Sequence, residues 1–227
     1  MATPLFDCHS RLQIFAPHPD DESLACGIVL QHAVVAGAAI NVVYLTDGEN
    51  NPWPQRCLTR RWRLNASDRQ KWAKLRRMEA LAALNVLNLS PDNARFLGWP
   101  DQGLAQRLKT DPILTRARLR YLIMDFSPTD VIGPDPADRH RDHSAVGCML
   151  DQAFAAGGAV FDKVRRWTYV VHGLNNDFRQ NAETVPQTSA QADSKMRAIK
   201  CHGSQLMLSR RRFLGYAGRP ELLREVT

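Results

Sequence analysis

Long apolar runs are missing from this sequence. Polar residues such as Gln31, His32 and Asn41 interrupt the longest candidate, so no stretch approaches the roughly 20 apolar residues of a membrane-spanning helix. The five cysteines are odd in number, scattered, and form no Cys-x-x-Cys pair. The first residues also lack the basic and then apolar order of a secretory leader. We therefore expect a cytoplasmic protein with reduced thiols and no transmembrane segment.

Signatures of two common binding functions are also absent. No Gly-x-Gly-x-x-Gly follows the first apolar segment, which argues against a dinucleotide-dependent enzyme. No helix-turn-helix or RNA-binding signature accompanies the 30 basic and 23 acidic residues, so we predict no nucleic-acid partner. The basic excess gathers at 56–77 and 210–224. Two interpretations remain open, a solvated basic face or attraction to an anionic small-molecule substrate.

What is present indicates a globular protein of alternating elements. The 227 residues, 44% of them apolar and 23% charged, suit a single domain spanning residues 1–227. The hydrophobic pattern predicts strands at 12–16, 39–46, 95–99, 129–133 and 166–171. It predicts helices at 22–36, 67–87, 111–126, 140–155 and 190–202. This alternation is typical of an α/β fold, here a Rossmann-like, doubly wound domain with a mostly parallel sheet.

Three segments fit neither the helical nor the strand pattern. Residues 50–65 contain prolines, arginines and two tryptophans, so we predict a long surface loop that selects the substrate. Residues 175–188 are polar and are expected to be irregular. The basic tail beyond residue 202 is compatible with a last helix.

Two loops carry the residues that indicate chemistry. His18, Asp20 and Asp21 follow the first predicted strand, and His140-Arg141-Asp142-His143 follows the fourth. Parallel strands end at one edge of a sheet, so these loops should converge. Two imidazoles and a carboxylate with open positions are a ligand set for catalytic zinc. His18, Asp21 and His143 are the predicted ligands, which leaves Asp20 and His140 for acid–base work.

Each loop alone is a weak signal. Asp20 and Asp21 could serve only as the cap and first-turn charges of a helix. The joint occurrence of both loops, each between a predicted strand and a predicted helix, favours the metal site. His9 and His32 do not follow this pattern, and His172 stays undecided.

Several motifs together resemble a known family. Residues 16–22, Ala-Pro-His-Pro-Asp-Asp-Glu, followed by Gly27, resemble the AHPDDE signature of the LmbE-like (PIG-L) zinc-dependent N-deacetylases. Further similar motifs lie in order along nearly the whole chain, at 46–49 (Thr-Asp-Gly-Glu), 76–79 (Arg-Arg-Met-Glu), 96–101, 140–143 and 195–205. The last histidine motif has Arg141 where the family usually has proline.

The resemblance implies a role for each matching residue. His18, Asp21 and His143 would hold zinc or another divalent metal. Asp20 would be the general base, and His140 would stabilise the oxyanion and serve as acid for the leaving amine. Asp142 either orients a neighbouring histidine or merely begins the helix.

Substrate contacts are implied for three further residues. Arg76 and Asp101 would approach sugar hydroxyls, and we add Glu49 from the second-strand motif. The alternative for Arg76 is a solvated charge or an ion pair with Glu79. Asp138 and Arg139 stand where some relatives carry a tyrosine.

We therefore expect a zinc-dependent hydrolase that removes an N-acetyl group from an N-acetylated amino sugar or glycoconjugate. The alternative is a sugar- or nucleotide-binding module on the same fold, without hydrolytic activity. The acetylated molecule stays open, and so does the oligomeric state, a homo-oligomer included.

Overall fold

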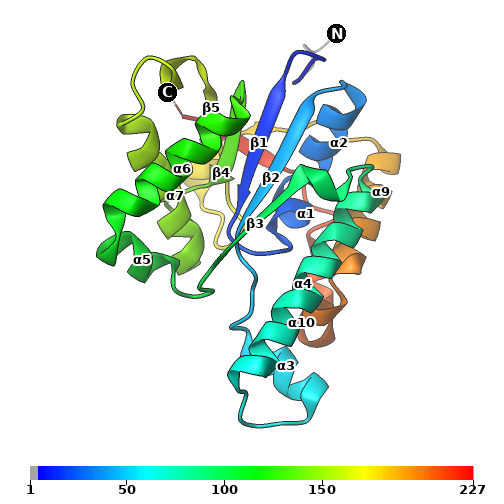
Figure 1. Ribbon diagram of the computed structural model, residues 1–227. Helices are drawn as coiled ribbons and strands as arrows, with labels where there is room; N and C mark the ends of the chain where they lie inside the picture. The colour runs from blue at the N-terminus through cyan, green and yellow to red at the C-terminus, as the bar shows by residue number, and fades with distance from the viewer. Residues whose placement is uncertain (1–4, 227) are drawn as a thin grey trace.

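The computed structural model describes residues 5–226 and is organised around a central sheet (Figure 1). The strand order is β3-β2-β1-β4-β5-β7-β6. The first five strands in this order are parallel to one another, and β7 runs antiparallel to β5 and β6. This confirms the predicted α/β fold with a mostly parallel sheet. The strands are β1 (Arg11–Ala16), β2 (Ala39–Thr46), β3 (Ala94–Trp99), β4 (Asp130–Pro134), β5 (Arg165–Tyr169), β6 (Glu183–Thr184) and β7 (Leu222–Glu225).

Helices cover both faces of the sheet (Figure 1). One layer contains α1 (Asp21–Ala25), α2 (Gly27–Val35), α4 (Ala66–Val86), α9 (Ser189–Cys201) and α10 (Gly203–Gly215). The other contains α5 (Leu104–Thr110), α6 (Pro112–Phe126) and α7 (Arg141–Ala155). Two short helices, α3 (Pro52–Thr59) and α8 (Asn176–Asn181), lie in connecting segments.

Alternation along the central strands divides the core into these two layers. Ile14 and Val42 belong to the cluster under α2 and α4, whereas Phe15 and Val43 belong to the cluster under α6 and α7. All four side chains are fully buried. Burial on both faces explains why these strands appear in the sequence as continuous apolar runs.

The predicted helix at 22–36 is wrong in one respect, because it breaks at Cys26 into α1 and α2. The Glu221 carboxylate accepts the N–H groups of Ile28 (2.8 Å) and Val29 (3.0 Å) at the start of α2. Lys195 Nζ lies 2.7 Å from Glu221 Oε1. A residue near the C-terminus thus satisfies the free donors of an N-terminal helix, and local spacing cannot reveal such a partner.

The predicted loop at 50–65 is also wrong, since it contains α3. Pro52 stands in the first turn of that helix, where a missing N–H costs nothing. The helix ends at Thr59, and the C-cap residue Arg60 has a left-handed conformation (φ 53°). Asn65, rather than Ser67 or Asp68, caps α4.

The remaining differences lie in polar or terminal segments. Residues 175–188 are not irregular, because they contain α8 and β6. The tail beyond residue 202 forms α10 as expected, but it then adds the antiparallel strand β7. Helix α5 was not predicted.

Candidate metal centre

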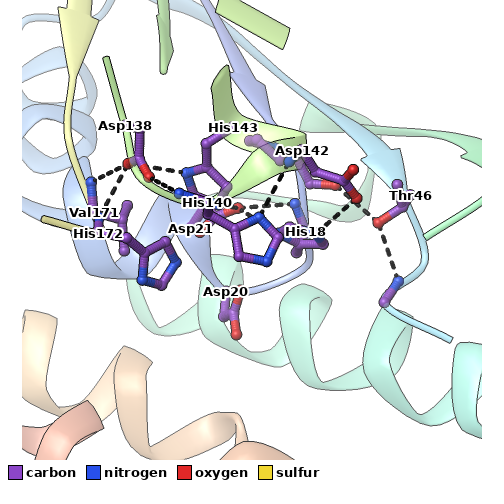
Figure 2. Close-up of polar contacts among 12 residues, drawn as sticks. His18, Asp20, Asp21, Thr46, Asp138, His140, Asp142, His143, Val171 and His172 are labelled. Atoms are coloured by element: carbon purple, nitrogen blue, oxygen red, sulfur yellow. Dashed lines mark hydrogen bonds and ion pairs between the residues drawn. The ribbon is translucent and has the colours of Figure 1, made fainter. Parts of the chain in front are cut away.

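Asp21 lies between two histidines from separate loops (Figure 2). Its Oδ2 atom accepts the backbone N–H of His18 at 2.8 Å. The same oxygen is 3.3 Å from His18 Nδ1 and 3.2 Å from His143 Nε2. The loops after β1 and β4 therefore converge at the carboxyl edge of the sheet, as parallel strands predict.

His140 and His143 stand at the start of α7. His140 is the N-cap residue, and its Nδ1 atom accepts the N–H of Asp142 at 3.3 Å. The ring centroids of His140 and His143 are 4.9 and 5.3 Å from that of His18. His143 is fully buried, and neither of its ring nitrogens makes a hydrogen bond within residues 5–226. Buried polar atoms without such partners are typical of ligand positions.

The donor set fits a zinc ion. Among residues 5–226, three overlapping groups place a possible ligand atom from each member within 4.8 Å of the others. They are His18–His140–His143, Asp21–His143–His172 and His18–Asp101–Asp142. The predicted ligands are spread over these groups and do not form one of them by themselves. Imidazole nitrogens and carboxylate oxygens are ordinary zinc donors, so the site can hold this metal.

Asp138 is the carboxylate beside the second nitrogen of His143, and sequence reasoning missed it. Its Oδ2 is 3.4 Å from His143 Nδ1 and accepts the N–H groups of Val171 (2.8 Å) and His172 (3.0 Å). Its Oδ1 accepts the N–H of His140 at 2.8 Å. Four contacts thus fix a carboxylate that can orient a metal-binding imidazole. The only signal in the sequence is an acidic residue five positions before His143.

Asp142 contacts a different histidine. Its carboxylate accepts the N–H groups of Gln102 (2.8 Å) and Leu104 (3.2 Å), which joins the loop after β3 to α7. Asp142 Oδ2 also lies 3.5 Å from His18 Nε2. Asp142 therefore lies in the first turn of α7 and also flanks His18, and its role in orienting that histidine stays a prediction.

The Asp20 carboxylate is in contact with Arg76. Arg76 Nη2 lies 3.1 Å from Asp20 Oδ2 and donates to the carbonyl oxygen of Pro19 at 2.7 Å. Arg76 is only 3% exposed. Neither alternative for it holds, since it is not solvated and Glu79 instead accepts the N–H and hydroxyl of Ser204.

Asp101 contacts His18, and Glu49 contacts the backbone of Asp101. Asp101 Oδ1 is 3.2 Å from His18 Nε2, and its Oδ2 accepts the N–H of Asn50 at 2.8 Å. Glu49 Oε1 accepts the N–H of Asp101 at 2.9 Å. Glu49 therefore supports the loop that carries Asp101, and only Asp101 lines the pocket described below.

His172, undecided from the sequence, lies at the same site after β5. Its ring centroid is 4.9 Å from that of His143 and 5.2 Å from that of His140. Arg212 Nη2 donates to its Nδ1 at 2.8 Å. Burial and the nearby His143 lower the pKa of His172 to about 4, so its imidazole is neutral at ordinary pH.

The surrounding charges set the protonation of the metal-free site. Although burial opposes it, contacts with Asp101, Asp142 and Asp21 hold the pKa of His18 well above its usual value. Burial likewise opposes a charged His143, but Asp21 raises its pKa to about 9. Carboxylates thus favour the charged form of both imidazoles.

For Asp20 and His140, in contrast, the surroundings favour the neutral form. Burial raises the pKa of Asp20, and the charge of Arg76 opposes that rise. Burial, together with His18 and His143, lowers the pKa of His140. The surroundings therefore shift the pKa values of Asp20 and His140 toward their neutral forms, whereas they shift those of the ligand histidines His18 and His143 toward their charged forms.

A pocket of about 390 Å³ opens above these residues, a size typical of small-molecule sites. It is lined by six of the predicted site residues, His18, Asp20, Asp21, Arg76, Asp101 and His140. Residues of α3 and α10 form its outer wall.

Comparison with known proteins identifies the family of the chain. Residues 13–154 match the family described as GlcNAc-PI de-N-acetylase (PIG-L), and the chain belongs to this family. It is 33% identical over 148 residues to 1D-myo-inositol 2-acetamido-2-deoxy-alpha-D-glucopyranoside deacetylase of Mycobacterium tuberculosis. That match covers 59% of this chain and 47% of the relative, so the chain spans about half the length of the curated relatives it matches.

Solved structures share the fold over almost the whole chain. A conserved protein of Thermus thermophilus is 26% identical, with a TM-score of 0.63 and coverage of 96% of this chain and 94% of that one. The zinc-inhibited form of teicoplanin deacetylase is 19% identical, with a TM-score of 0.70 and coverage of 96% and 98%.

The same fold also serves a different reaction. The 4-carboxy-2-hydroxymuconate hydratase of Pseudomonas putida is 19% identical, with a TM-score of 0.68 and coverage of 96% of both chains. The function must therefore be argued from the site and not from the fold. No helix within residues 5–226 is long and apolar enough to cross a membrane.

Proposed function

We propose that the protein is a zinc-dependent hydrolase that removes an N-acetyl group from an N-acetylated amino sugar or glycoconjugate. The observation that carries this proposal is the position of the Asp21 carboxylate, within 3.3 Å of His18 and 3.2 Å of His143. Asp20 and His140 line the same pocket. Membership of a de-N-acetylase family supports the reaction class.

His18, Asp21 and His143 would hold the metal, with Asp138 orienting His143. When bound, zinc supplies Lewis acidity to an attacking water and to the amide carbonyl. Asp20 accepts the proton of that water, because its carboxylate is at the pocket and is not needed as a ligand. The adjacent Arg76 guanidinium favours the ionised form that a base requires.

His140 lines the same pocket and acts on the amide carbonyl. The backbone N–H of Asp142 can only donate, so Nδ1 of His140 is an acceptor and the neutral ring carries its proton on Nε2. That N–H donates a hydrogen bond to the developing negative charge on the carbonyl oxygen. In place of the acid role expected for His140, the proton that Asp20 has taken from the water passes to the departing amine, which leaves poorly as an anion. The neutral His140 ring keeps its Nε2 proton, because losing it would leave an imidazolate.

A substrate contact is assigned to one pocket residue, Asp101. Asp101 accepts a hydrogen bond from a sugar hydroxyl, and Glu49 fixes the loop that carries it. Arg76 contributes mainly by holding Asp20, because its buried guanidinium already contacts Asp20 and Pro19. We also propose a cytoplasmic location, on the basis of the five free cysteines.

Two measurements test the proposal. The purified protein should contain a tightly bound divalent metal by elemental analysis. It should release acetate from at least one member of a panel of N-acetylated sugars and their phosphorylated forms. Absence of both the metal and acetate release would favour a binding module on this fold.

A further inference from the structure

An apolar and basic surface surrounds the mouth of the pocket. We call it the α3–α10 rim and define it as residues 52–63 and 203–215. Asn51, directly before the first segment, donates from Nδ2 to Gln205 Oε1 of the second at 3.1 Å. Figure 1 shows α3 and α10 together at the lower end of the molecule, beyond the carboxyl ends of the strands.

Large apolar side chains are exposed on this rim. The exposed fractions are 57% for Trp53, 54% for Leu58, 72% for Trp62, 45% for Met207 and 52% for Leu208. Trp53 and Leu208 also line the pocket. The mouth of the candidate active site therefore has an apolar lip contributed by both segments, and clustered exposure of this kind marks an interaction surface.

The tryptophans are held in place by an arginine. The Arg56 guanidinium carbon lies 5.0 Å from the ring centroid of Trp53 and 4.7 Å from that of Trp62. Arg56 Nε also donates to the carbonyl oxygen of Trp62 at 3.0 Å. This stacking orders two indoles that remain largely in solvent.

The charged residues of the rim are all basic. Its two segments contain seven arginines and no aspartate or glutamate. Arg60, Arg63, Arg210 and Arg211 are exposed, have no ion pair within the described residues 5–226, and do not line the pocket. A small anionic substrate inside the pocket would not need these four charges, whereas an extended anionic surface would meet all of them.

We propose that the α3–α10 rim docks on the surface of an anionic lipid membrane and presents the pocket to substrates carried by that membrane. Tryptophan and aliphatic side chains enter the boundary between head groups and acyl chains, and arginines contact anionic head groups. Leu58, Met207 and Leu208 distinguish this partner from a nucleic acid, which offers aliphatic side chains no apolar phase. The substrate part of this inference rests on the proposed function.

The test is co-sedimentation of the full chain with vesicles of phosphatidylcholine, alone or mixed with phosphatidylglycerol. Binding is expected only to the mixed vesicles and should weaken as salt is added. Tryptophan emission should shift to shorter wavelength on binding. Trp72, Trp99 and Trp167 are buried, so this shift reports Trp53 and Trp62.

Two variants separate the parts of the rim. Trp53→Ser with Trp62→Ser should abolish the emission shift and weaken binding at least about tenfold. Arg60→Gln, Arg63→Gln, Arg210→Gln and Arg211→Gln combined should weaken it by on the order of 100-fold. All of these side chains are exposed, and circular dichroism verifies that each variant is folded.

A matched control lies on α6, in the opposite layer. Tyr121 and Met124 are 51% and 55% exposed, and Arg118 stacks 5.3 Å above Tyr121. Arg118→Gln with Tyr121→Ser and Met124→Ser should leave vesicle binding unchanged. Equal loss in this control, full binding by the tryptophan variant, or no binding of the wild type to mixed vesicles would each overturn the proposal.

The docking proposal and the proposed reaction can be refuted independently of each other. Asp20→Asn should bind vesicles like the wild type, because Asp20 lies inside the pocket and not on the rim. A protein that releases acetate from soluble sugars but ignores vesicles would overturn the docking proposal alone. One that binds vesicles through the rim but releases no acetate would support docking and refute the proposed reaction.

Discussion

Arg76 Nη2 lies 3.1 Å from Asp20 Oδ2, and both side chains are buried. Burial raises the pKa of Asp20, whereas the Arg76 guanidinium opposes that change. The pair places a permanent positive charge beside the carboxylate that we propose as the general base. Arg76 is thus a positioning residue whose removal should affect turnover more than metal binding.

Arg76→Gln should lower kcat by roughly tenfold to 100-fold, because it removes the charge that keeps the base ionised and in place. Zinc content should stay at the wild-type level, as Arg76 contacts no proposed ligand except through Asp20. Steady-state kinetics and elemental analysis on the same preparation check both statements. A variant with normal kcat and a raised KM would instead assign Arg76 to substrate binding.

Gly48→Ala should also lower kcat, by less than Arg76→Gln does, although Arg76 itself is not substituted. A Cβ atom at this position would lie 2.7 Å from Arg76 Nη1 and so displace the guanidinium. Gly48 also has a φ of 64°, a left-handed conformation that costs alanine about 1–2 kcal/mol.

Gly158→Ala is the control, since Gly158 has a φ of 68° but a Cβ atom there would meet nothing within 4 Å among the described residues. It should share the backbone strain and keep full activity. If both glycine variants lose activity equally, crowding of Arg76 is not the cause.

His143→Ala should lose zinc affinity almost completely, because it removes a fully buried ligand candidate. Asp138→Asn should weaken zinc binding by about 10- to 100-fold, the usual effect of changing the carboxylate behind a metal-binding histidine. Equilibrium dialysis with zinc checks both variants. Wild-type affinity in His143→Ala would refute the assigned ligand set.

Glu221→Gln should destabilise the fold, since it leaves the buried Lys195 ammonium without its charged partner. Breaking a buried ion pair typically costs about 3–5 kcal/mol. Urea unfolding measures this change. Asp125→Asn breaks the exposed pair of Arg95 and Asp125 and should cost no more than about 1 kcal/mol, so similar losses in both variants would contradict the structural role of Glu221.

The five cysteines should react with a thiol reagent in order of exposure. Cys8 and Cys57 are exposed, Cys148 and Cys201 are half-buried, and Cys26 is buried. Burial raises the pKa of the Cys26 thiol well above its usual value, so little reactive thiolate forms at mildly alkaline pH. Two fast thiols and one that reacts only after unfolding are expected, and fast modification of Cys26 would contradict the packing around α1 and α2.

The sequence predicted the parts of the site that depend on local order and strand direction. His18 and Asp21 follow an apolar strand, His140 and His143 follow another, and parallel pairing brings both strand ends together. That geometry follows from one rule about parallel sheets. The convergence of these loops was therefore predictable without knowing any side-chain contact.

Contacts between distant segments were not predictable in the same way. Asp20 and Arg76 are separated by 56 positions, and Glu221 reaches the start of α2 from the far end of the chain. Asp138 was overlooked because an acidic residue in a loop has many ordinary roles. The helix α3 was missed because its prolines resemble a loop signal, although Pro52 stands where a helix tolerates it.

Acetate release by zinc-loaded Asp20→Asn, compared with the wild type on the same N-acetylated sugars, tests the central claim most directly. The substitution keeps the shape of the side chain, leaves all three proposed ligands in place and removes the proton acceptor. We predict wild-type zinc content and a fall in turnover of about 10²–10⁴-fold. Turnover equal to that of the wild type would show that Asp20 is not the base.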